Sequence, residues 1–300
     1  MPFLRKKKAH RVKVKRYYRK DGSTIELTEQ QDRETRKLDA EMNWDKPDRL
    51  KLIGKACLHS KYFDIAEWIF ERVMELDEDD DEAIIEFSSS LLNQKRWDEA
   101  EEIISNYLAS DPSSSTAHQF MAAIHEHNGD DGKALEEIDK ALECDPNNEN
   151  VLWMLYWKTH NKLGDAGALR KMQELATRFP QSWGSVYIMA KHYEDVKPEV
   201  AMEHYETALR KEDADPILIS YTAFLGKTGK FHELIDVVEK SRKGKSVDFR
   251  VLFNLGEAYL EEGKIDEAHE LSMELQALAP PPYVSRLKDL IHRIHSAKRT

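Results

Sequence analysis

The chain has 300 residues, of which 40% are hydrophobic and 34% are charged, with only 12 Gly and 10 Pro. This composition is typical of a folded, helix-rich protein and excludes a largely disordered one. The net charge is −11, yet residues 1 to 20 carry ten Lys and Arg and no acid, so residues 21 to 300 carry −11 − 10 = −21. A basic arm therefore precedes an acidic body.

The sequence predicts a cytoplasmic protein that has no membrane as a partner. No apolar stretch approaches the roughly 18 residues of a membrane helix, and no apolar segment of the kind found in secretory leaders follows the basic start. Cys57 and Cys144 lack metal or redox spacing, so we expect small buried side chains in a reducing compartment. A mitochondrial presequence is the weaker alternative, because the arm is poor in Ser and shows no amphipathic stripe.

The first section, residues 1–46, differs from the rest of the chain. The tight-turn pair Asp21-Gly22 separates two short runs of strand-forming residues, which predicts a hairpin within 11–27. Thr28 and Gln31 have the spacing of a capping box, so a polar helix should follow over 28–43. We expect this helix to lean on the first repeat, because its apolar residues are too sparse to form a core.

The arm is also a candidate for nucleic-acid contact, since cations can bind phosphates while aromatic rings stack on bases. Two alternatives stay open: a solvated tail, or an arm folded onto an acidic stretch such as 77–82. The candidate contact residues are Arg5, Lys6, Lys7, Lys8, Arg11, Lys13, Lys15, Arg16, Tyr17, Tyr18, Arg19 and Lys20.

From residue 47 onward a 34-residue pattern recurs. The segment 96–112, RWDEAEEIISNYLASDP, returns as 130–146, DDGKALEEIDKALECDP, with Ala100 matched by Ala134 and an Asp-Pro pair closing both copies. A fixed period of this length indicates a repeat array. Each copy predicts two helices, each with one apolar face.

The copies continue to residue 282 with local departures. The fifth is one residue short, with its turn at 194–198, and the sixth has Leu234 where the other copies have Ala. A last amphipathic helix within 283–300 should cap the open end of the stack.

The repeats resemble the tetratricopeptide repeat (TPR) family, in seven copies over 47–282. The seventh copy carries the signature most fully, in Leu255-Gly256, Tyr259, Ala268 and Pro280, whereas Ser88 and Tyr156 replace the signature glycine elsewhere. The resemblance implies an all-α fold: a right-handed superhelical solenoid of antiparallel helix pairs, whose inner groove, lined by the first helix of each pair, binds protein segments.

Three recurring residue types support this alignment physically. The small Ala marks where the second helix crosses its neighbours closely, and the Pro ends that helix. Gly129, Gly164, Gly229 and Gly263 fall in the turn between the two helices, where a left-handed backbone is often needed.

Carrying the groove positions of the family onto this chain gives a set of candidate partner-binding residues. Trp153 and Trp157 stand out, because residues four apart share one helix face and aromatic side chains are favoured anchors at interfaces. The alternative is that both rings fold into the core between repeats. The candidates are Ile85, Gln119, Trp153, Trp157, Tyr187, Lys191 and Phe253.

No catalytic or metal-binding pattern is apparent in the sequence. The histidine pairs lack a third ligand, and there is no phosphate-binding glycine loop or nucleophile motif. The carboxylate clamp of one TPR subtype is also missing from the groove positions. We therefore expect a scaffold or adaptor that is not an enzyme, has no cofactor or small-molecule substrate, and binds a peptide or protein. The alternative is an adaptor that docks on nucleic acid or the ribosome through its basic arm.

Overall fold

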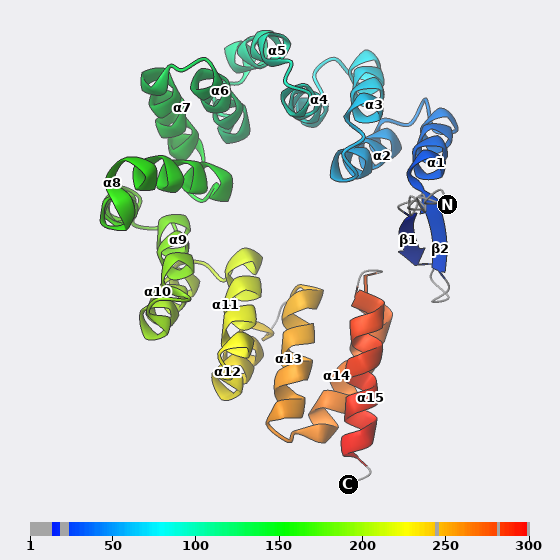
Figure 1. Cartoon of the computed structure of the whole chain (residues 1–300), viewed down its shortest axis with the longest axis vertical. Coiled ribbons are helices and arrows are strands. Elements are labelled where there is room, and N and C mark those ends of the chain that lie inside the picture. The colour runs from blue at the N-terminus through cyan, green and yellow to red at the C-terminus, as the bar shows by residue number, and fades with distance from the viewer. Residues whose placement is uncertain (1–13, 19–23, 244–245, 281–282, 299–300) are drawn as a thin grey trace, which may run out of the picture. The chain divides into compact units, whose positions relative to one another are not determined.

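The structure is a computed structural model that describes residues 14–18, 24–243, 246–280 and 283–298. Within these ranges it contains one two-stranded sheet and fifteen helices (Figure 1). The strands are β1 (Val14–Tyr18) and β2 (Thr24–Thr28), and the helices are α1 (Glu29–Glu41), α2 (Pro47–His59), α3 (Phe63–Leu76), α4 (Asp81–Asn93), α5 (Trp97–Ser110), α6 (Ser115–His127), α7 (Asp131–Cys144), α8 (Glu149–Arg178), α9 (Gly184–Tyr193), α10 (Pro198–Lys211), α11 (Asp215–Lys227), α12 (Phe231–Ser241), α13 (Phe249–Glu261), α14 (Ile265–Leu278) and α15 (Val284–Ala297).

The chain divides into two compact units, Met1–Pro112 and Ser113–Thr300. The first unit contains the hairpin, α1 and the helix pairs α2–α3 and α4–α5. The second contains the remaining pairs, from α6–α7 to α13–α14, followed by α15. Within each unit the helices pack against their neighbours in sequence, as expected for a helical-repeat solenoid.

The predicted helix pairs are confirmed throughout the repeats. The recurring small residue lies in the packing between helices, and Ala100, Ala134 and Ala268 are all buried. In the fourth repeat the two helices run together as α8, with a kink at Gly164 (φ 69°, ψ −173°). That backbone conformation is essentially restricted to glycine, so Gly164 allows the chain to reverse where a longer turn is missing.

The turns within the pairs explain the spacing of the glycines. Gly129, Gly229 and Gly263 have φ between +71° and +76°, as predicted for a left-handed position. The first two repeats hold Lys61 (φ 62°) and Lys95 (φ 63°) at this position instead. These two left-handed positions could not be predicted, because nothing in a lysine indicates a left-handed backbone.

The sixth repeat accommodates Leu234 through a neighbouring glycine. Leu234 is buried, and its Cδ1 lies 3.8 Å from where a Cβ of Gly226 in α11 would be. In the seventh repeat the two corresponding positions hold Ala268 and Leu260. The larger and the smaller side chain are therefore exchanged between the two positions.

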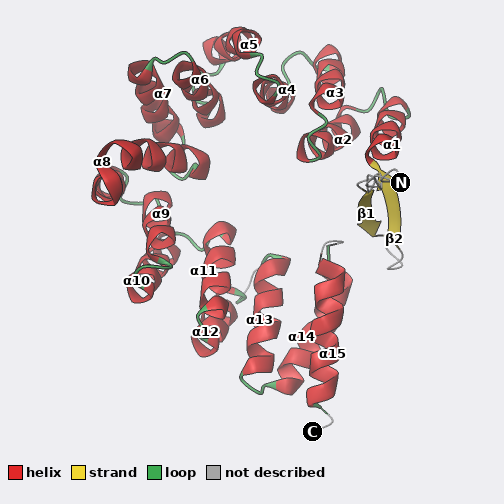
Figure 2. Ribbon diagram, in the orientation of Figure 1, coloured by secondary structure: helices red, strands yellow, loops and turns green. Residues whose placement is uncertain are grey.

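Figure 2 shows β1 and β2 in the region where the sequence predicts a hairpin, and α1 within the range of the predicted polar helix. β1 and β2 pair antiparallel, with Tyr17 opposite Ile25. Thr28 and Gln31 form the predicted capping box at the start of α1. The helix leans on the first repeat, where the hydroxyl of Tyr62 donates to Asp32 at 2.8 Å and Arg33 lies 2.5 Å from Asp64.

The final helix, α15, covers the seventh repeat. Leu287, Leu290 and Ile294 are buried against it, and Arg293 donates to Glu257 and Glu261, both at 2.6 Å.

The two cysteines differ in burial: Cys57 is buried, which raises the pKa of its thiol to about 11, whereas Cys144 is exposed. The expectation that both are buried is therefore wrong for Cys144, which is the last residue of α7.

Candidate interaction surface

The first half of α8 presents two tryptophans on one helix face. Asn148 begins the helix by accepting a hydrogen bond from the amide of Val151, which sets the rotation of the residues that follow. The rings of Trp153 and Trp157 are 6.2 Å apart with their planes 21° from parallel. Trp157 is 52% exposed and Trp153 is half-buried against the core. The alternative of two rings inside the core therefore does not describe Trp157.

A buried tyrosine packs against both tryptophans. Tyr156 contacts Trp153 edge-on at 5.4 Å and Trp157 edge-on at 5.2 Å, an arrangement that aromatic pairs favour. Its hydroxyl lies 2.6 Å from Nδ1 of His192 in α9, so the next repeat fixes its position. Tyr156 occupies the place of the signature glycine. The replacement of glycine by tyrosine at this position therefore places a ring in contact with both tryptophans.

Ring contacts continue from α8 to α10. His160 contacts Trp157 at 5.2 Å and forms an ion pair of 3.1 Å with Asp165 if it is protonated. Tyr193 stacks on His204 at 5.7 Å, and burial lowers the pKa of the His204 imidazole. We call the whole set the aromatic ladder: Trp153, Tyr156, Trp157, His160, His192, Tyr193 and His204.

Two other predicted groove residues are covered by protein. Tyr187 is buried, with its hydroxyl 2.8 Å from Oγ of Ser220 in α11. Phe253 is buried beneath Arg286, whose guanidinium carbon lies 5.0 Å from the ring centre. Both side chains contribute to packing between helices.

The remaining predicted groove residues are partly exposed and are not gathered into one site. Lys191 donates to Glu194 at 2.8 Å, so its charge is matched within the repeat. Ile85 on α4 is half-buried and belongs to the first unit, whereas Gln119 on α6 is half-buried and belongs to the second. Their role in partner binding stays a prediction.

The basic arm has only two described side chains among its candidate contacts, and both face α1. The ammonium of Lys15 donates to Asp32 at 3.2 Å, and the hydroxyl of Tyr17 accepts from Arg36 at 3.5 Å. Arg16 and Tyr18 lie in β1, but their side chains are outside the described structure. The other candidates, Arg5, Lys6, Lys7, Lys8, Arg11, Lys13, Arg19 and Lys20, lie outside the described residues.

Asp32 is the buried carboxylate that joins the arm to the repeats. It accepts from Lys15 and Tyr62 and lies 3.3 Å from Nε of Arg36. Burial by itself raises the pKa of the Asp32 carboxyl. Hydrogen bonds from Tyr17, Tyr62 and Lys15 and the charge of Arg36 lower the pKa by more than burial raises it, so the net shift is downward. The sequence did not reveal this group, because its partners are far apart along the chain.

A second long-range contact that sequence reasoning missed lies at the start of α9. Oδ1 of Asn147 accepts from Oγ of Ser182 at 2.6 Å and from the amides of Trp183 and Gly184 at 3.0 and 2.9 Å. A Cβ on Gly184 would come within 2.9 Å of the carbonyl oxygen of Pro146. Asn147 therefore supplies the cap that α9 lacks, and glycine allows the close approach of the two segments.

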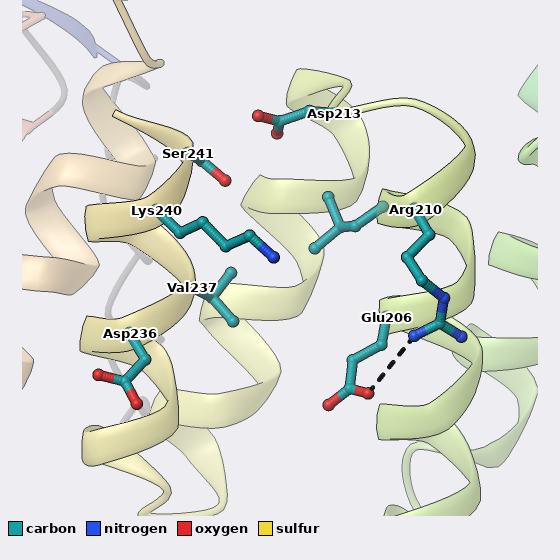
Figure 3. A pocket seen from close by; sticks show the side chains of 8 residues that line it. Glu206, Arg210, Asp213, Asp236, Val237, Lys240 and Ser241 are labelled. Atoms are coloured by element: carbon teal, nitrogen blue, oxygen red, sulfur yellow. Dashed lines mark ion pairs between the residues drawn. The ribbon is translucent and has the colours of Figure 1, made fainter. Parts of the chain in front are cut away.

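The second unit also contains an open cleft between α10 and α12 (Figure 3). Its volume is about 460 Å³, and Leu209 and Val237 provide its apolar surface. Figure 3 shows Lys240 reaching into it from α12, opposite Glu206 and Arg210 on α10, whose charged groups are 3.9 Å apart. The cleft is polar at its rim and carries acids and bases in nearly equal number.

The described residues also bear on metal binding and on membrane insertion. No group of three or more His, Cys, Asp or Glu side chains in the described part of the chain is placed to hold a metal ion. Among the helices that the structure describes, none is both long and apolar enough to cross a membrane.

Comparison with known proteins identifies the repeat. A family model described as the tetratricopeptide repeat matches residues 63–124, and a second model with the same description matches residues 249–281. The chain is 34% identical over 76 residues to the protein O-mannosyl-transferase TMTC1 of Mus musculus, which is 25% of this chain and 8% of the mouse protein.

Solved structures show a likeness of fold. The crystal structure of yeast Tom70 is similar with a TM-score of 0.55 at 17% identity, over 88% of this chain and 57% of Tom70. A tetratricopeptide repeat protein from Parabacteroides merdae has a TM-score of 0.41 at 12% identity, over 83% of this chain and 98% of that protein. This chain thus spans well under two thirds of both the mouse protein and Tom70.

The fold is an all-α solenoid of helix pairs, the architecture of protein-interaction scaffolds. Residues 63–124 and 249–281 match the tetratricopeptide repeat, and the helix pairs between them continue the same architecture.

Proposed function

We propose that this chain is a non-catalytic adaptor that binds a peptide or protein segment on the aromatic ladder of the fourth and fifth repeats. The observation that carries the proposal is the exposure of Trp157, which is 52%. A large apolar ring that is supported from below yet open to solvent is the arrangement of an interface anchor, because docking buries much apolar area without reordering the ring.

Two further large apolar side chains in these repeats are exposed. Leu163, near the kink of α8, is 69% exposed, and Val196, in the turn after α9, is 67% exposed. Both belong to the same two repeats as the ladder. Large apolar side chains that are exposed to solvent favour binding to another protein when a partner covers them.

The test is to select binding peptides from a displayed random library on the full chain and then compare variants. Trp157→Ala should weaken the selected peptides by about 2 kcal/mol or more, the size of an interface hot spot. Leu278→Ala is the matched control, because Leu278 is also 52% exposed but lies on α14. Equal binding by the wild type and Trp157→Ala would contradict the proposal, provided that their circular dichroism spectra agree.

The alternative, in which the chain docks on nucleic acid or the ribosome through its basic arm, needs a separate test. The described part of the arm uses Lys15 and Tyr17 for contacts with α1, which leaves these two side chains engaged within the chain. Binding to single-stranded RNA that is lost on deletion of residues 1–13, and that weakens steeply with salt, would favour the alternative over the ladder.

A further inference from the structure

Two histidines from different helices meet where the final helix packs on the seventh repeat. His269 lies on α14 and His295 on α15, and their ring centres are 5.6 Å apart with the ring planes 62° from parallel. The sequence shows instead the pair His292 and His295, which belong to one helix. The pair that joins two helices therefore becomes visible only in the structure.

The separation of the two rings fits a shared metal ion. Zinc binds imidazole nitrogen at about 2.0–2.1 Å, and two imidazoles on one ion then have their centres roughly 5–6 Å apart. The observed distance between His269 and His295 falls in this range. Rotation of the two side chains, without movement of either helix, would bring both rings to one ion.

His269 has a ring nitrogen that the protein leaves without a partner. Its Nδ1 is buried and forms no hydrogen bond with the described residues. The buried ring of His118, by contrast, has its Nδ1 2.6 Å from Glu137. A buried polar atom without a partner is unfavourable, and a bound ion or water is a common explanation for one. The geometry and the unpaired nitrogen thus point to the same place.

The charged neighbours of the pair can accommodate a cation. Asp266 lies one turn before His269 on α14, and it pairs with Lys298 on α15 at 3.1 Å. The ion pair and the histidine pair are therefore adjacent across the contact between the two helices. The side chain of Asp266 is 89% exposed, so it is free to change its position.

We propose that His269 and His295 bind a zinc ion, which joins α15 to α14 and holds the final helix on the seventh repeat. Imidazole is a preferred ligand of zinc, whereas magnesium and calcium prefer oxygen. Two imidazoles are fewer protein ligands than structural or catalytic zinc sites use, so water would complete the coordination. The site would therefore exchange its ion readily and would add stability only when zinc is present.

The probe is zinc chloride alone, added to the full chain after a chelator has removed bound metal. Zinc at ten times its dissociation constant should raise the melting temperature by about 2–4 °C, because an ion that binds only the folded state stabilises it. Magnesium chloride should cause no rise. His295→Ala should abolish the rise, and it should keep its fold because His295 is exposed.

Three further variants make the test specific. His292→Ala and Cys144→Ser remove other exposed side chains that can bind zinc, and both should keep the full rise. Lys298→Gln releases Asp266 as a third ligand and should tighten zinc binding several-fold. No rise in the wild type, an equal rise in His295→Ala, or loss of the rise in His292→Ala would overturn the proposal. The measurement uses no peptide, so its outcome is independent of the aromatic ladder.

Discussion

Single residues in this chain act mainly by permitting backbone geometry or by exposing a side chain that the repeat does not need. Gly164 and Gly184 belong to the first kind, since one reverses the chain within α8 and the other lets α9 approach the preceding loop. Trp157 belongs to the second kind. Its neighbour Tyr156 is buried, so the same turn of helix contributes to both the core and the surface.

A pair of glycine substitutions tests the role of the backbone. A Cβ at Gly164 would meet no atom within 4 Å, so Gly164→Ala should lower stability only through its backbone conformation, by about 1–3 kcal/mol. Gly132 is the second residue of α7, where its backbone is already helical, and a Cβ there would meet only Asp130 at 3.5 Å. Gly132→Ala should therefore raise stability by about 0.5–1 kcal/mol. Urea denaturation followed by circular dichroism measures both, and equal effects would contradict this account.

Residue patterns predicted the repeats well and the side-chain contacts less well. The Ala, Gly and Pro positions follow from local geometry, which recurs every 34 residues and is therefore visible in the sequence. The burial of Tyr187 and Phe253 depends instead on Ser220 and Arg286 in later helices. Family positions place a residue on a helix face but do not show which neighbouring side chain covers it.

At the scale of elements, the hairpin and α1 form an addition to the first repeat that is held by buried charge. Asp32 is only 3% exposed, and its contacts come from β1, α1 and Tyr62. A buried carboxylate is stable only when its partners are retained, so the three elements should dock together. The capping box could be predicted from sequence because its members are three residues apart, whereas the pairing of Lys15 with Asp32 could not.

The pKa of Asp32 gives this docking a dependence on pH. Because the folded state lowers the pKa, ionised Asp32 adds stability above the ordinary pKa of about 3.9, and this stability is lost as the pH falls below that value. Asp32→Asn should destabilise the docked hairpin by about 1–3 kcal/mol at neutral pH.

The difference between wild type and Asp32→Asn should shrink between pH 7 and pH 3, because the carboxyl of the unfolded chain takes up a proton below its ordinary pKa of about 3.9. Hydrogen exchange of the β2 amides, compared between the two proteins at each pH, measures it. A difference that stays the same at both pH values would show that Asp32 does not act through its charge.

At the scale of the whole molecule, the chain is a series of similar helix pairs in which function lies where the pairs differ. The two units carry different departures from the pattern: left-handed lysines in the first, and in the second an aromatic ladder in which Trp157 is exposed. The predicted division of the chain into an arm (1–46), a solenoid (47–282) and a cap (283–300) remains a prediction about domain organisation. Each pair contacts mainly its neighbours, so substitutions in one unit should leave the other intact.

The central claim is that a partner segment docks on the aromatic ladder. Hydrogen exchange of the full chain, measured with and without a peptide selected on the wild type, tests it most directly. We predict slower exchange in the first half of α8 and in α9, and no such change in Trp157→Ala. Protection confined to α2 and α4, or retained in Trp157→Ala, would contradict the claim.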